Sequence, residues 1–575
     1  MNSADRRRVL ILGRGDRAFL TTIRSLGRMG LEVHVGMCYP NDIALRSRYV
    51  HAVHHIPAYR SCDDSWLNAM TNLLRSQKFA LVVPCNDHAV IPLQVYRDQL
   101  RDLARLATLN DRAFTIAFDK IETFRLAQSL GVHQARGSVV TTDITIAEAL
   151  SGLCLPVVFK PPSSFALDDP SSRRAVRRAR TQTEAESLLA RSRSWERVLI
   201  QEQFNGAGIG IEVLAKNGEI LTALQHERVH EPLEGGGSSY RKTTPLHDGM
   251  LADTRRLIAA MAYTGVAMVE FKYDRTRDDW SLIEINGRFW GSLPLAVSAG
   301  LDFPAFLYQM LVEERAVFPR SYRLGMHCRH LSSDFYWLLA NARANKKDSS
   351  LATRRVTEIL SEPLNVIAGR ERWDTFAWDD LRPGFAELGS FAAQLTVKSR
   401  RYVERRIAET PWARRCTASR IAAKARNARR ILFVCKGNIC RSPFAELYAR
   451  TRSPAGVQIS SSGSFRTQNR PSPDVAILVA GEYGVDLTQH RSRVLDKAQA
   501  DEADMILTFD RNNFDEVRIA YPDVRDRIFP LGALAMSREL DIEDPFGDDA
   551  DRFRMVYASI AEAVTRLCEA LSTCT

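Results

Sequence analysis

The sequence lacks the long apolar runs and the cysteine density that mark membrane-spanning and disulfide-stabilised proteins. None of its apolar stretches approaches the roughly 20 residues that cross a bilayer. Its first apolar run, Val9 to Leu12, is too short for the core of a signal peptide. Only 10 cysteines occur in 575 residues, most of them isolated in apolar segments, which excludes a disulfide framework. We therefore expect a cytoplasmic protein with reduced thiols.

An acidic excess is absent as well, since the formal net charge is +11. A basic surface favours acidic partners such as nucleotides, phosphates or anionic lipid. The hydrophobic and charged fractions, 45% and 26%, are those of an ordinary globular protein. A chain of this length exceeds what one hydrophobic core supports, so we expect about two to four domains.

Two regions alternate short apolar strands with amphipathic helices. Residues 1–115 contain the strand patterns RVLILG, LEVHVG and FALVVP, which predict a parallel sheet with right-handed crossovers. The turn after the first strand, at Gly13, reads G-x-G-x-x-A, but the second strand ends without the acidic residue of a dinucleotide site. We favour a turn that serves only the fold. Residues 116–330 are mixed helix and strand, and β/α alternation resumes in residues 430–575.

Basic residues concentrate between Val397 and Arg430, where 12 lysines and arginines stand against only two glutamates. Residues 331–429 are also poor in strand patterns, so we predict a helical region that ends in a basic linker. Such a run is more often a solvated helix than a binding surface, although it also suits weak contact with an anionic membrane. We expect no specific nucleic-acid partner.

The stretch VCKGNICRSP carries the clearest chemistry of the chain. It places Cys435 at the end of a buried strand pattern and Ser442-Pro443 at the start of a helix. A loop between a strand and a helix directs backbone N–H groups inward and can bind a phosphate dianion. Arg441 can grip two phosphoryl oxygens with its planar guanidinium. The same positive field favours the thiolate of Cys435, so a phosphate-handling nucleophile is predicted.

A proton donor for the leaving group is supplied by the sequence DIEDPFGDD, which contains Asp544. With these motifs, and with SSSGSF, HRSR and ILTFDRNN between them, residues 430–575 resemble the low-molecular-weight protein tyrosine phosphatases, which implies a flavodoxin-like α/β domain with a central parallel sheet. The resemblance implies that Cys435 is the nucleophile, Arg441 the phosphate clamp, Ser442 the thiolate partner and Asp544 the general acid. It also implies a phosphate-binding loop made of Lys436, Gly437, Asn438, Ile439 and Cys440.

Two departures from the family pattern bear on substrate preference. Phe546 and Gly547 follow Asp544 where many members have paired tyrosines, and the mouth segment has serine in place of threonine or alanine. A related arsenate reductase needs two further cysteines for a disulfide relay, and none occurs between Cys440 and Cys568. We expect a phosphomonoester or phosphotyrosine substrate; a decayed binding module remains an alternative.

A second constellation lies in MVEFKYDRTRDDWSLIEINGRFWGS, which predicts two antiparallel strands joined by a polar hairpin. Strand alternation places Glu284 and Asn286 on one face, and Glu270 of the first strand can meet them there. Two carboxylates and an amide oxygen suit a hard divalent ion that bridges nucleotide phosphates. We predict Mg²⁺, with Mn²⁺ as an alternative, and Arg288 within reach of the same face.

Upstream residues complete an ordered set. Lys120 begins a helix pattern, Lys160 ends a buried strand pattern, and Gln201-Glu202 end another. This set resembles the ATP-grasp superfamily over residues 8–320, in particular its carboxylate–amine ligases related to carbamoyl-phosphate synthetase. The resemblance implies a Rossmann-like domain before an α+β grasp domain that binds ATP. It assigns the nucleotide phosphates to Lys120 and Lys160, adenine to Gln201, Glu202 and Phe204, and the transferred phosphoryl group to Arg288.

Two loops of this region depart from the pattern or extend it. The family often has a glycine-rich flap after the first strand lysine, and here residues 161–172, PPSSFALDDPSS, contain no glycine. Residues 226–243 contain a triple glycine followed by Arg241, which we interpret as a lid over the acceptor side.

We therefore predict a bifunctional α/β multidomain enzyme. One half transfers the γ-phosphoryl group of ATP to a small carboxylate, and an amine then displaces phosphate from the acyl phosphate. The other half is a phosphatase that works through a cysteinyl-phosphate intermediate. The alternative hypothesis is a regulatory tyrosine phosphatase whose amino-terminal half senses a nucleotide without turning it over.

Overall fold

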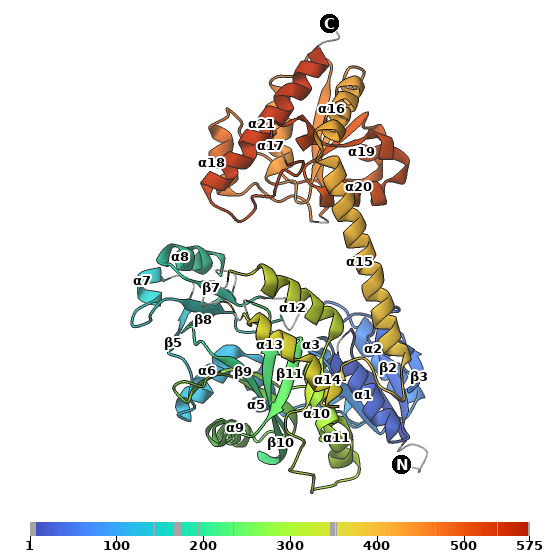
Figure 1. Cartoon of the computed structure of the whole chain (residues 1–575), viewed down its shortest axis with the longest axis vertical. Coiled ribbons are helices and arrows are strands. Elements are labelled where there is room, and N and C mark those ends of the chain that lie inside the picture. The colour runs from blue at the N-terminus through green and yellow to red at the C-terminus, as the bar shows by residue number, and fades with distance from the viewer. Residues whose placement is uncertain are drawn as a thin grey trace. The chain divides into compact units, whose positions relative to one another are not determined.

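The computed structural model describes residues 7–15, 17–141, 144–165, 174–192, 195–233, 235–345, 351, 353–465, 467–537 and 539–572. The chain divides into two compact units, residues 1–392 and 393–575 (Figure 1). The boundary falls within helix α15 (Arg382–Ala408), so the predicted helical region contributes to both units. The finer predicted division into four domains, with boundaries after residues 115, 330 and 429, stays a prediction.

The first unit begins with the predicted parallel sheet. Its strand order is β3-β2-β1-β4, all parallel, with bounds β1 (Arg8–Leu12), β2 (Glu32–Gly36), β3 (Val50–His54) and β4 (Leu81–Pro84). Helix α1 (Arg17–Arg28) follows the first turn. A Cβ atom added at Gly13 would lie 2.9 Å from the Phe19 ring. The close approach of that ring explains this glycine, in agreement with a turn that serves the fold.

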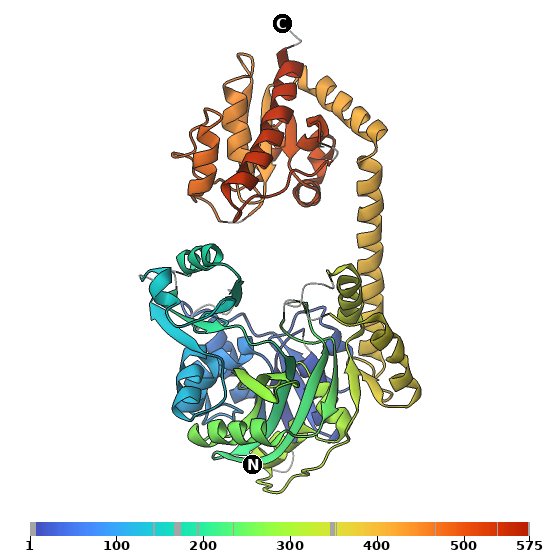
Figure 2. The ribbon, with the colours of Figure 1, turned by 60° about the vertical axis from the view of Figure 1, so that its left-hand side comes forward.

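Two further sheets complete the first unit. A small antiparallel sheet has the order β5-β8-β6-β7, with bounds β5 (Gly137–Thr141), β6 (Val157–Lys160), β7 (Arg177–Ala179) and β8 (Arg197–Glu202). In Figure 2 this cyan and teal segment stands off from the green strands of the large sheet. The large sheet has the order β13-β12-β9-β10-β11-β14-β15, with bounds β9 (Ala207–Lys216), β10 (Glu219–His230), β11 (Tyr240–Thr244), β12 (Gly265–Asp274), β13 (Asp279–Asn286), β14 (His327–Arg329) and β15 (Glu371–Trp373).

Helices bind these sheets together through shared apolar packing. One core cluster joins β1 and α1 to residues of the large sheet and to two consecutive helices, α10 (Leu293–Ala299) and α11 (Phe303–Val312). Among the described residues, no single helix has the length and hydropathy of a membrane span; α10 and α11 meet that test only as a pair bent by 85°. The remaining helices used below are α3 (Asp87–Val95), α6 (Lys120–Ser129), α12 (Leu331–Arg343), α13 (Val356–Ser361) and α14 (Pro363–Ile367).

The second unit contains the predicted central parallel sheet, in the order β17-β16-β18-β19. One apolar cluster packs α17 and α21 on one face, and a separate cluster, which includes Val517 of α20, covers the other. The arrangement is that of a flavodoxin-like α/β domain. The bounds are β16 (Arg430–Cys435), β17 (Gln458–Gly463), β18 (Met505–Thr508), β19 (Ile528–Pro530), α16 (Pro411–Ala425), α17 (Arg441–Arg450), α20 (Arg511–Ala520) and α21 (Ala550–Ser572).

The basic linker is helical, as predicted, but part of it belongs to the second unit. Ile421 and Ala425 of α16 are buried in the same core cluster as α21. Arg414 donates hydrogen bonds to the carbonyl oxygens of Gly532 and Ala535, at 3.2 and 2.7 Å. Some of the linker's charge therefore stabilises the fold instead of standing in solvent.

Candidate active sites

The loop between β16 and α17 gathers backbone groups around the sulfur of Cys435. The side chain of Cys435 is buried at the end of its strand, and the Asn438 amide N–H donates to its Sγ atom at 3.2 Å. Asn438 has a left-handed φ of +50°, which turns the loop back toward the strand. The hydroxyl oxygen of Ser442 lies 3.1 Å from the same sulfur. The predicted nucleophile and its predicted partner are therefore in contact.

The side chain of Asn438 fastens this loop to two neighbouring segments. Its Nδ2 atom donates to the hydroxyls of Ser442 and Ser461, at 2.9 and 2.8 Å, and its Oδ1 atom accepts from the Arg493 amide at 2.8 Å. Ser461 and Arg493 belong to the SSSGSF and HRSR motifs. Because Asn438 is fully buried and each of its polar side-chain atoms is bonded, the loop is held in one conformation.

Arg441 is the most deeply buried charge of the second unit's site, with 1% of its surface exposed. It lies 2.6 Å from Asp510 and 2.7 Å from Asp544. Burial alone would lower the pKa of Arg441, but Cys435, Asp544 and Asp510 outweigh it and raise that pKa. Sequence reasoning did not single out Asp510, although it stands in the ILTFDRNN motif, where it also caps α20 by accepting from the Asn513 amide at 2.8 Å.

The other predicted loop residues differ in exposure. Lys436 is exposed, whereas Ile439 and Cys440 are buried. The carbonyl oxygen of Gly437 accepts a hydrogen bond of 2.6 Å from Arg470. Burial raises the pKa of the Cys440 thiol, so this second cysteine is held neutral beside the nucleophile.

The first unit contains a cavity of about 1330 Å³ between its sheets. Lys120, Lys160 and Arg288 line it together with the three predicted metal ligands. The described residues that line it do not include Gln201, Glu202 or Phe204. The structure thus brings the predicted phosphate-side residues together in one place and does not bring the predicted adenine-side residues to it.

The predicted antiparallel pairing of β12 and β13 is confirmed, with Glu270 directly opposite Glu284. Asn286 donates from Nδ2 to both carboxylates, at 3.1 and 3.3 Å. Burial raises the pKa of Glu270, while Arg228 opposes that effect from 2.6 Å. Burial also opposes ionisation of Glu284, but Lys120, Arg288, Asn286 and Arg228 together outweigh it, so the Glu284 pKa is lowered. Two opposed carboxylates and an amide within hydrogen-bonding reach fit an oxygen-ligated divalent cation.

The two lysines approach this group from separate elements. Asp119 caps α6 by accepting from the Ile121 amide at 2.7 Å, which places Lys120 at the helix start. The Nζ atom of Lys120 lies 3.5 Å from Glu284 and donates to the Ser164 hydroxyl at 2.8 Å. Lys160 is buried at the end of β6 and donates to the carbonyl oxygen of Ile283 at 3.3 Å. Burial lowers the pKa of Lys160 to about 8.

Arg288 makes a bidentate ion pair that sequence reasoning missed. Its Nε and NH2 atoms donate to the two carboxylate oxygens of Asp87, at 2.8 and 3.0 Å. Asp87 begins α3, 201 residues earlier in the chain, and lines the same cavity. No sequence signal links residues so far apart; a strand-ending C-N-D-H pattern offers only a weak indication.

The carboxylate of Glu202 contacts two protein groups in this structure. Arg136 reaches it at 3.0 Å, and the Cys154 amide donates to it at 2.8 Å. Gln201 donates to the carbonyl oxygen of Ala135 at 3.2 Å. The adenine assignment of Gln201, Glu202 and Phe204 stays a prediction.

The two loops noted in the sequence have different outcomes. Residues 166–172 of the predicted flap segment lie outside the described residues. In the predicted lid, β10 and β11 take up both ends and leave only residues 231–239 between them. Arg241 is fully buried in β11, where NH1 donates to Asp374 at 2.8 Å. The interpretation of Arg241 as part of a lid is therefore wrong, because its side chain is committed to the core.

Comparison with known proteins finds a family-model match in each half of the chain. The family model for low molecular weight phosphotyrosine protein phosphatases matches residues 430–574. The model for the ATP-grasp in the biosynthetic pathway with Ter operon matches residues 194–333.

Two curated relatives cover the second unit. The protein-arginine-phosphatase of Geobacillus stearothermophilus is 33% identical over 144 residues, which are 25% of this chain and 97% of that protein. The low molecular weight protein-tyrosine-phosphatase Etp of Escherichia coli K12 is 34% identical over 142 residues, 25% of this chain and 94% of that one. Biotin carboxylase from Campylobacter jejuni, solved with a β,γ-ATP ligand, matches 57% of this chain and 75% of its own at 17% identity and a TM-score of 0.46. Through residues 430–574 the chain belongs to the low molecular weight phosphotyrosine protein phosphatases, and residues 194–333 of the first unit match the ATP-grasp model.

Proposed function

We propose that the chain is a bifunctional enzyme, an ATP-dependent carboxylate–amine ligase joined to a cysteine-dependent phosphatase. The observation that carries this proposal is that each unit gathers its predicted reactive side chains at one place. In the second unit, Cys435, Arg441 and Ser442 lie at the two ends of one loop, between β16 and α17. In the first, Glu270, Glu284 and two lysines line one cavity.

For the phosphatase, the sulfur of Cys435 attacks the phosphorus atom of a phosphomonoester. Inward backbone N–H groups and the Arg441 guanidinium hold the three phosphoryl oxygens. Asp544 gives its proton to the departing alcohol oxygen, and cysteinyl phosphate remains. Asp544 then takes a proton from the water that releases phosphate. Ser442, 3.1 Å from the sulfur, stabilises the thiolate as it leaves.

The phosphate donor is proposed to be phosphotyrosine. One relative is named as a tyrosine phosphatase and another as an arginine phosphatase, so both classes are candidates. Phe546, two residues after Asp544, is 61% exposed and offers an apolar contact to an aromatic ring. Matched peptides with phosphotyrosine or phosphoarginine test this choice: faster phosphate release from the arginine peptide would reverse it.

For the ligase, Lys120 and Lys160 neutralise the phosphates of ATP. Glu270, Glu284 and Asn286 would hold Mg²⁺ or Mn²⁺, which would neutralise negative charge on the nucleotide phosphates when bound. Arg288 would leave Asp87 to stabilise the phosphoryl group in transfer. The carboxylate substrate takes the γ-phosphoryl group and leaves ADP, and the amine then displaces inorganic phosphate to form an amide.

The experiment for the ligase is a screen of amino acids and small amines for ADP production, with products identified by mass. ADP release that requires both a carboxylate and an amine, and that Glu284→Ala abolishes, supports the proposal. ADP release that needs no acceptor counts against the proposal. The absence of ADP release with every tested pair of carboxylate and amine also counts against it.

A nucleotide sensor is the second candidate, and the ion pairs of the cavity favour it. Arg288 is held by Asp87 and Glu270 by Arg228, so two reactive side chains are engaged before any ligand binds. In that case ATP binds without turnover, and phosphatase activity changes with ATP concentration. Phosphatase assays with and without a non-hydrolysable ATP analogue separate this candidate from the ligase.

We also propose a cytoplasmic location and a weak contact of the basic linker with anionic lipid. Arg400 and Arg406 of α15 are exposed and stand beside the exposed apolar residues Tyr402, Val403 and Ile407. Replacement of both arginines by glutamate should reduce sedimentation with vesicles that contain phosphatidylserine. Equal sedimentation of the variant and the unmodified chain would remove this proposal.

A further inference from the structure

The glycine loop, residues 231–233 and 235–239, connects β10 to β11. Its residues Gly235 to Ser238 line the same cavity as the two lysines and the predicted metal ligands. Gly236 has a φ of +122°, a backbone conformation that residues with a Cβ atom rarely adopt. The course of the loop past the cavity therefore depends on this glycine and on how the loop's two ends are held.

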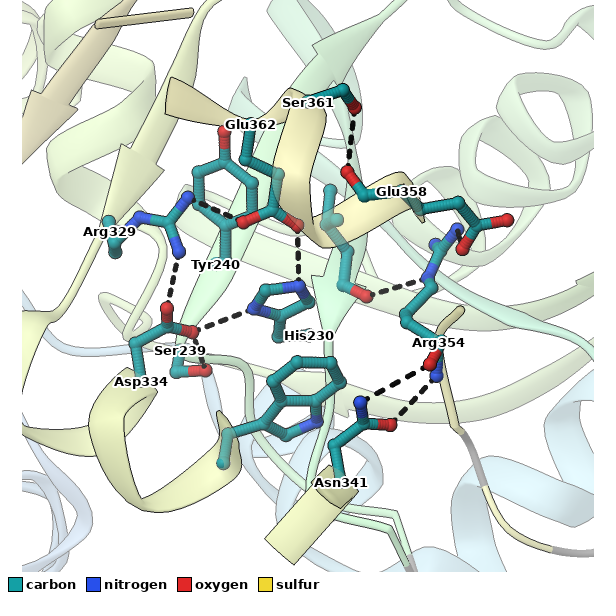
Figure 3. Close-up of polar contacts among 12 residues, drawn as sticks. His230, Ser239, Tyr240, Arg329, Asp334, Asn341, Arg354, Glu358, Ser361 and Glu362 are labelled. Carbon is teal, nitrogen blue, oxygen red and sulfur yellow. Dashed lines mark hydrogen bonds and ion pairs between the residues drawn. The ribbon is translucent and has the colours of Figure 1, made fainter. Parts of the chain in front are cut away.

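Both ends of the glycine loop are held by Asp334 of α12 (Figure 3). Its Oδ1 atom lies 2.8 Å from Nδ1 of His230, the last residue of β10, and accepts a hydrogen bond of 2.7 Å from the Ser239 hydroxyl. The Ser239 amide also donates to the His230 carbonyl oxygen at 3.0 Å. Because one carboxylate bonds both residues, it fixes the separation of the two ends of the loop.

The side chain of His230 is fully buried. Its ring stacks on Trp337 with centroids 3.5 Å apart. Its Nε2 atom lies 2.7 Å from Glu362, which Figure 3 shows beside the ring. Burial alone would lower the pKa of His230, but Asp334 and Glu362 outweigh it and raise that pKa. Arg329 pairs with both carboxylates and so balances their charge. Charge-assisted hydrogen bonds in a buried site are stronger than neutral ones, which makes this a firm attachment.

The other side of the glycine loop is tied to a predicted metal ligand. Arg228 donates from NH1 to the Gly236 carbonyl oxygen at 2.6 Å, and its NH2 atom lies 2.6 Å from Glu270. Arg17 donates to the Ser238 carbonyl oxygen at 2.8 Å. Because Arg228 contacts both the loop and Glu270, a shift of the loop would alter the position of the Glu270 carboxylate.

We propose that His230, Ser239 and Asp334 form a clasp that positions the glycine loop against the phosphate end of a bound nucleotide. None of the three is among the described residues that line the cavity, so they are positioning residues that act through the loop. The inference rests on the proposed ATP-binding function of the first unit. It adds a role for Asp334 of α12 and for Glu362, the residue between α13 and α14, whose carboxylates supply the clasp with its charge.

The first experiment compares the affinities of the full chain for Mg·ATP and for AMP by calorimetry. Asp334→Asn and His230→Gln should each weaken ATP binding by about tenfold, the equivalent of one charge-assisted hydrogen bond. AMP lacks the β- and γ-phosphates, so its affinity should stay within about twofold of the unmodified chain's. Glu358→Gln is the matched control, because the Glu358 carboxylate of α13 contacts Arg354 at 3.6 Å and accepts from the Arg355 amide at 3.4 Å, and neither contact involves the three clasp residues.

Hydrogen exchange of the glycine loop supplies a second readout that needs no ligand. Asp334→Asn should speed exchange at the Ser239 amide by at least about tenfold, with peptides of β16 unchanged. Equal losses of ATP and AMP affinity would overturn the positioning role, because a general loss of structure affects both. Unchanged loop exchange in both variants would overturn the clasp. If the unmodified chain binds no ATP, the ATP-grasp proposal fails and loop exchange alone decides the clasp.

Discussion

The two sites of this protein are built in opposite ways. The nucleophile, its hydroxyl partner and the phosphate clamp of the phosphatase site lie within one stretch, from Cys435 to Ser442, although Asp510 and Asp544 reach Arg441 from elsewhere in the domain. The cavity of the first unit draws on residues from Arg14 to Ser292 and holds its charges in long-range ion pairs. A contiguous loop can be formed before any ligand arrives. A cavity of paired charges must exchange protein partners for substrate, so its chemistry depends on the fold as a whole.

The comparison is tested most strongly at Cys435. Cys435→Ser should lower hydrolysis of an aryl phosphate by on the order of 10⁴-fold, because the weaker nucleophile cannot form the covalent intermediate. Phosphate release is the measurement, and ATP binding by the first unit, which should not change, is the control. Residual activity close to that of the unmodified chain would show that another group performs the attack.

The corresponding test of the first unit is Glu284→Ala. Loss of one of two opposed carboxylates removes a predicted metal ligand, so ADP production should fall by at least about a hundredfold. Aryl phosphatase activity of the same preparation reports on correct folding of the second unit. Undiminished ADP production would remove Glu284 from the proposed metal site.

A smaller effect is expected where the phosphatase loop is fastened. Asn438→Ala leaves the hydroxyl of Ser461 and the amide of Arg493 without their present partner, which should cost about 1–3 kcal/mol of unfolding free energy. Thermal denaturation of residues 393–575 and the kcat for an aryl phosphate measure the consequence. If both match the unmodified chain, the loop does not depend on this side chain, and the contrast with the cavity weakens.

The smallest effect concerns the charge of Lys160. Its pKa is lowered to about 8 by burial, so the amine is protonated below that pH and loses its charge as the pH rises through it. Affinity for Mg·ATP should therefore decline severalfold between about pH 7 and 9, by up to about tenfold for loss of one charge-assisted contact. Calorimetry across this range is the measurement. Lys160→Met should bind ATP more weakly at pH 7 and show a flatter profile; an unchanged slope would assign the decline to another group.

Much of the phosphatase site was predictable because its geometry is local. A strand, a short loop and a helix start determine where Cys435, Ser442 and Arg441 lie relative to one another, whatever surrounds them. Asp544 was predicted as the proton donor from the sequence DIEDPFGDD and from the family resemblance, and it lies 2.7 Å from Arg441 in the structure. Sequence reasoning missed Asp510, the ion-pair partner of Arg441, because a helix-capping pattern does not indicate a second contact of the same side chain.

The cavity of the first unit was predictable only where strand pairing is regular. Alternation along two strands was enough to place Glu270 opposite Glu284. The Arg288–Asp87 pair joins elements that are distant in the chain, and the interpretation of Arg241 failed because burial against Asp374 depends on tertiary packing. Strand β3 was also missed, because its histidine-rich sequence, VHAVH, lacks a clear apolar run.

By itself, the sequence determined the order of helices and strands around each site, the candidate reactive groups and the phosphatase family of residues 430–574. These follow from periodicity, caps and contiguous motifs, which act over a few residues. Only the tertiary structure decided which charges neutralise one another: Arg228 with Glu270, Arg288 with Asp87 and Asp334 with His230. Buried charges require partners, and the partner is whichever opposite charge the fold brings within reach.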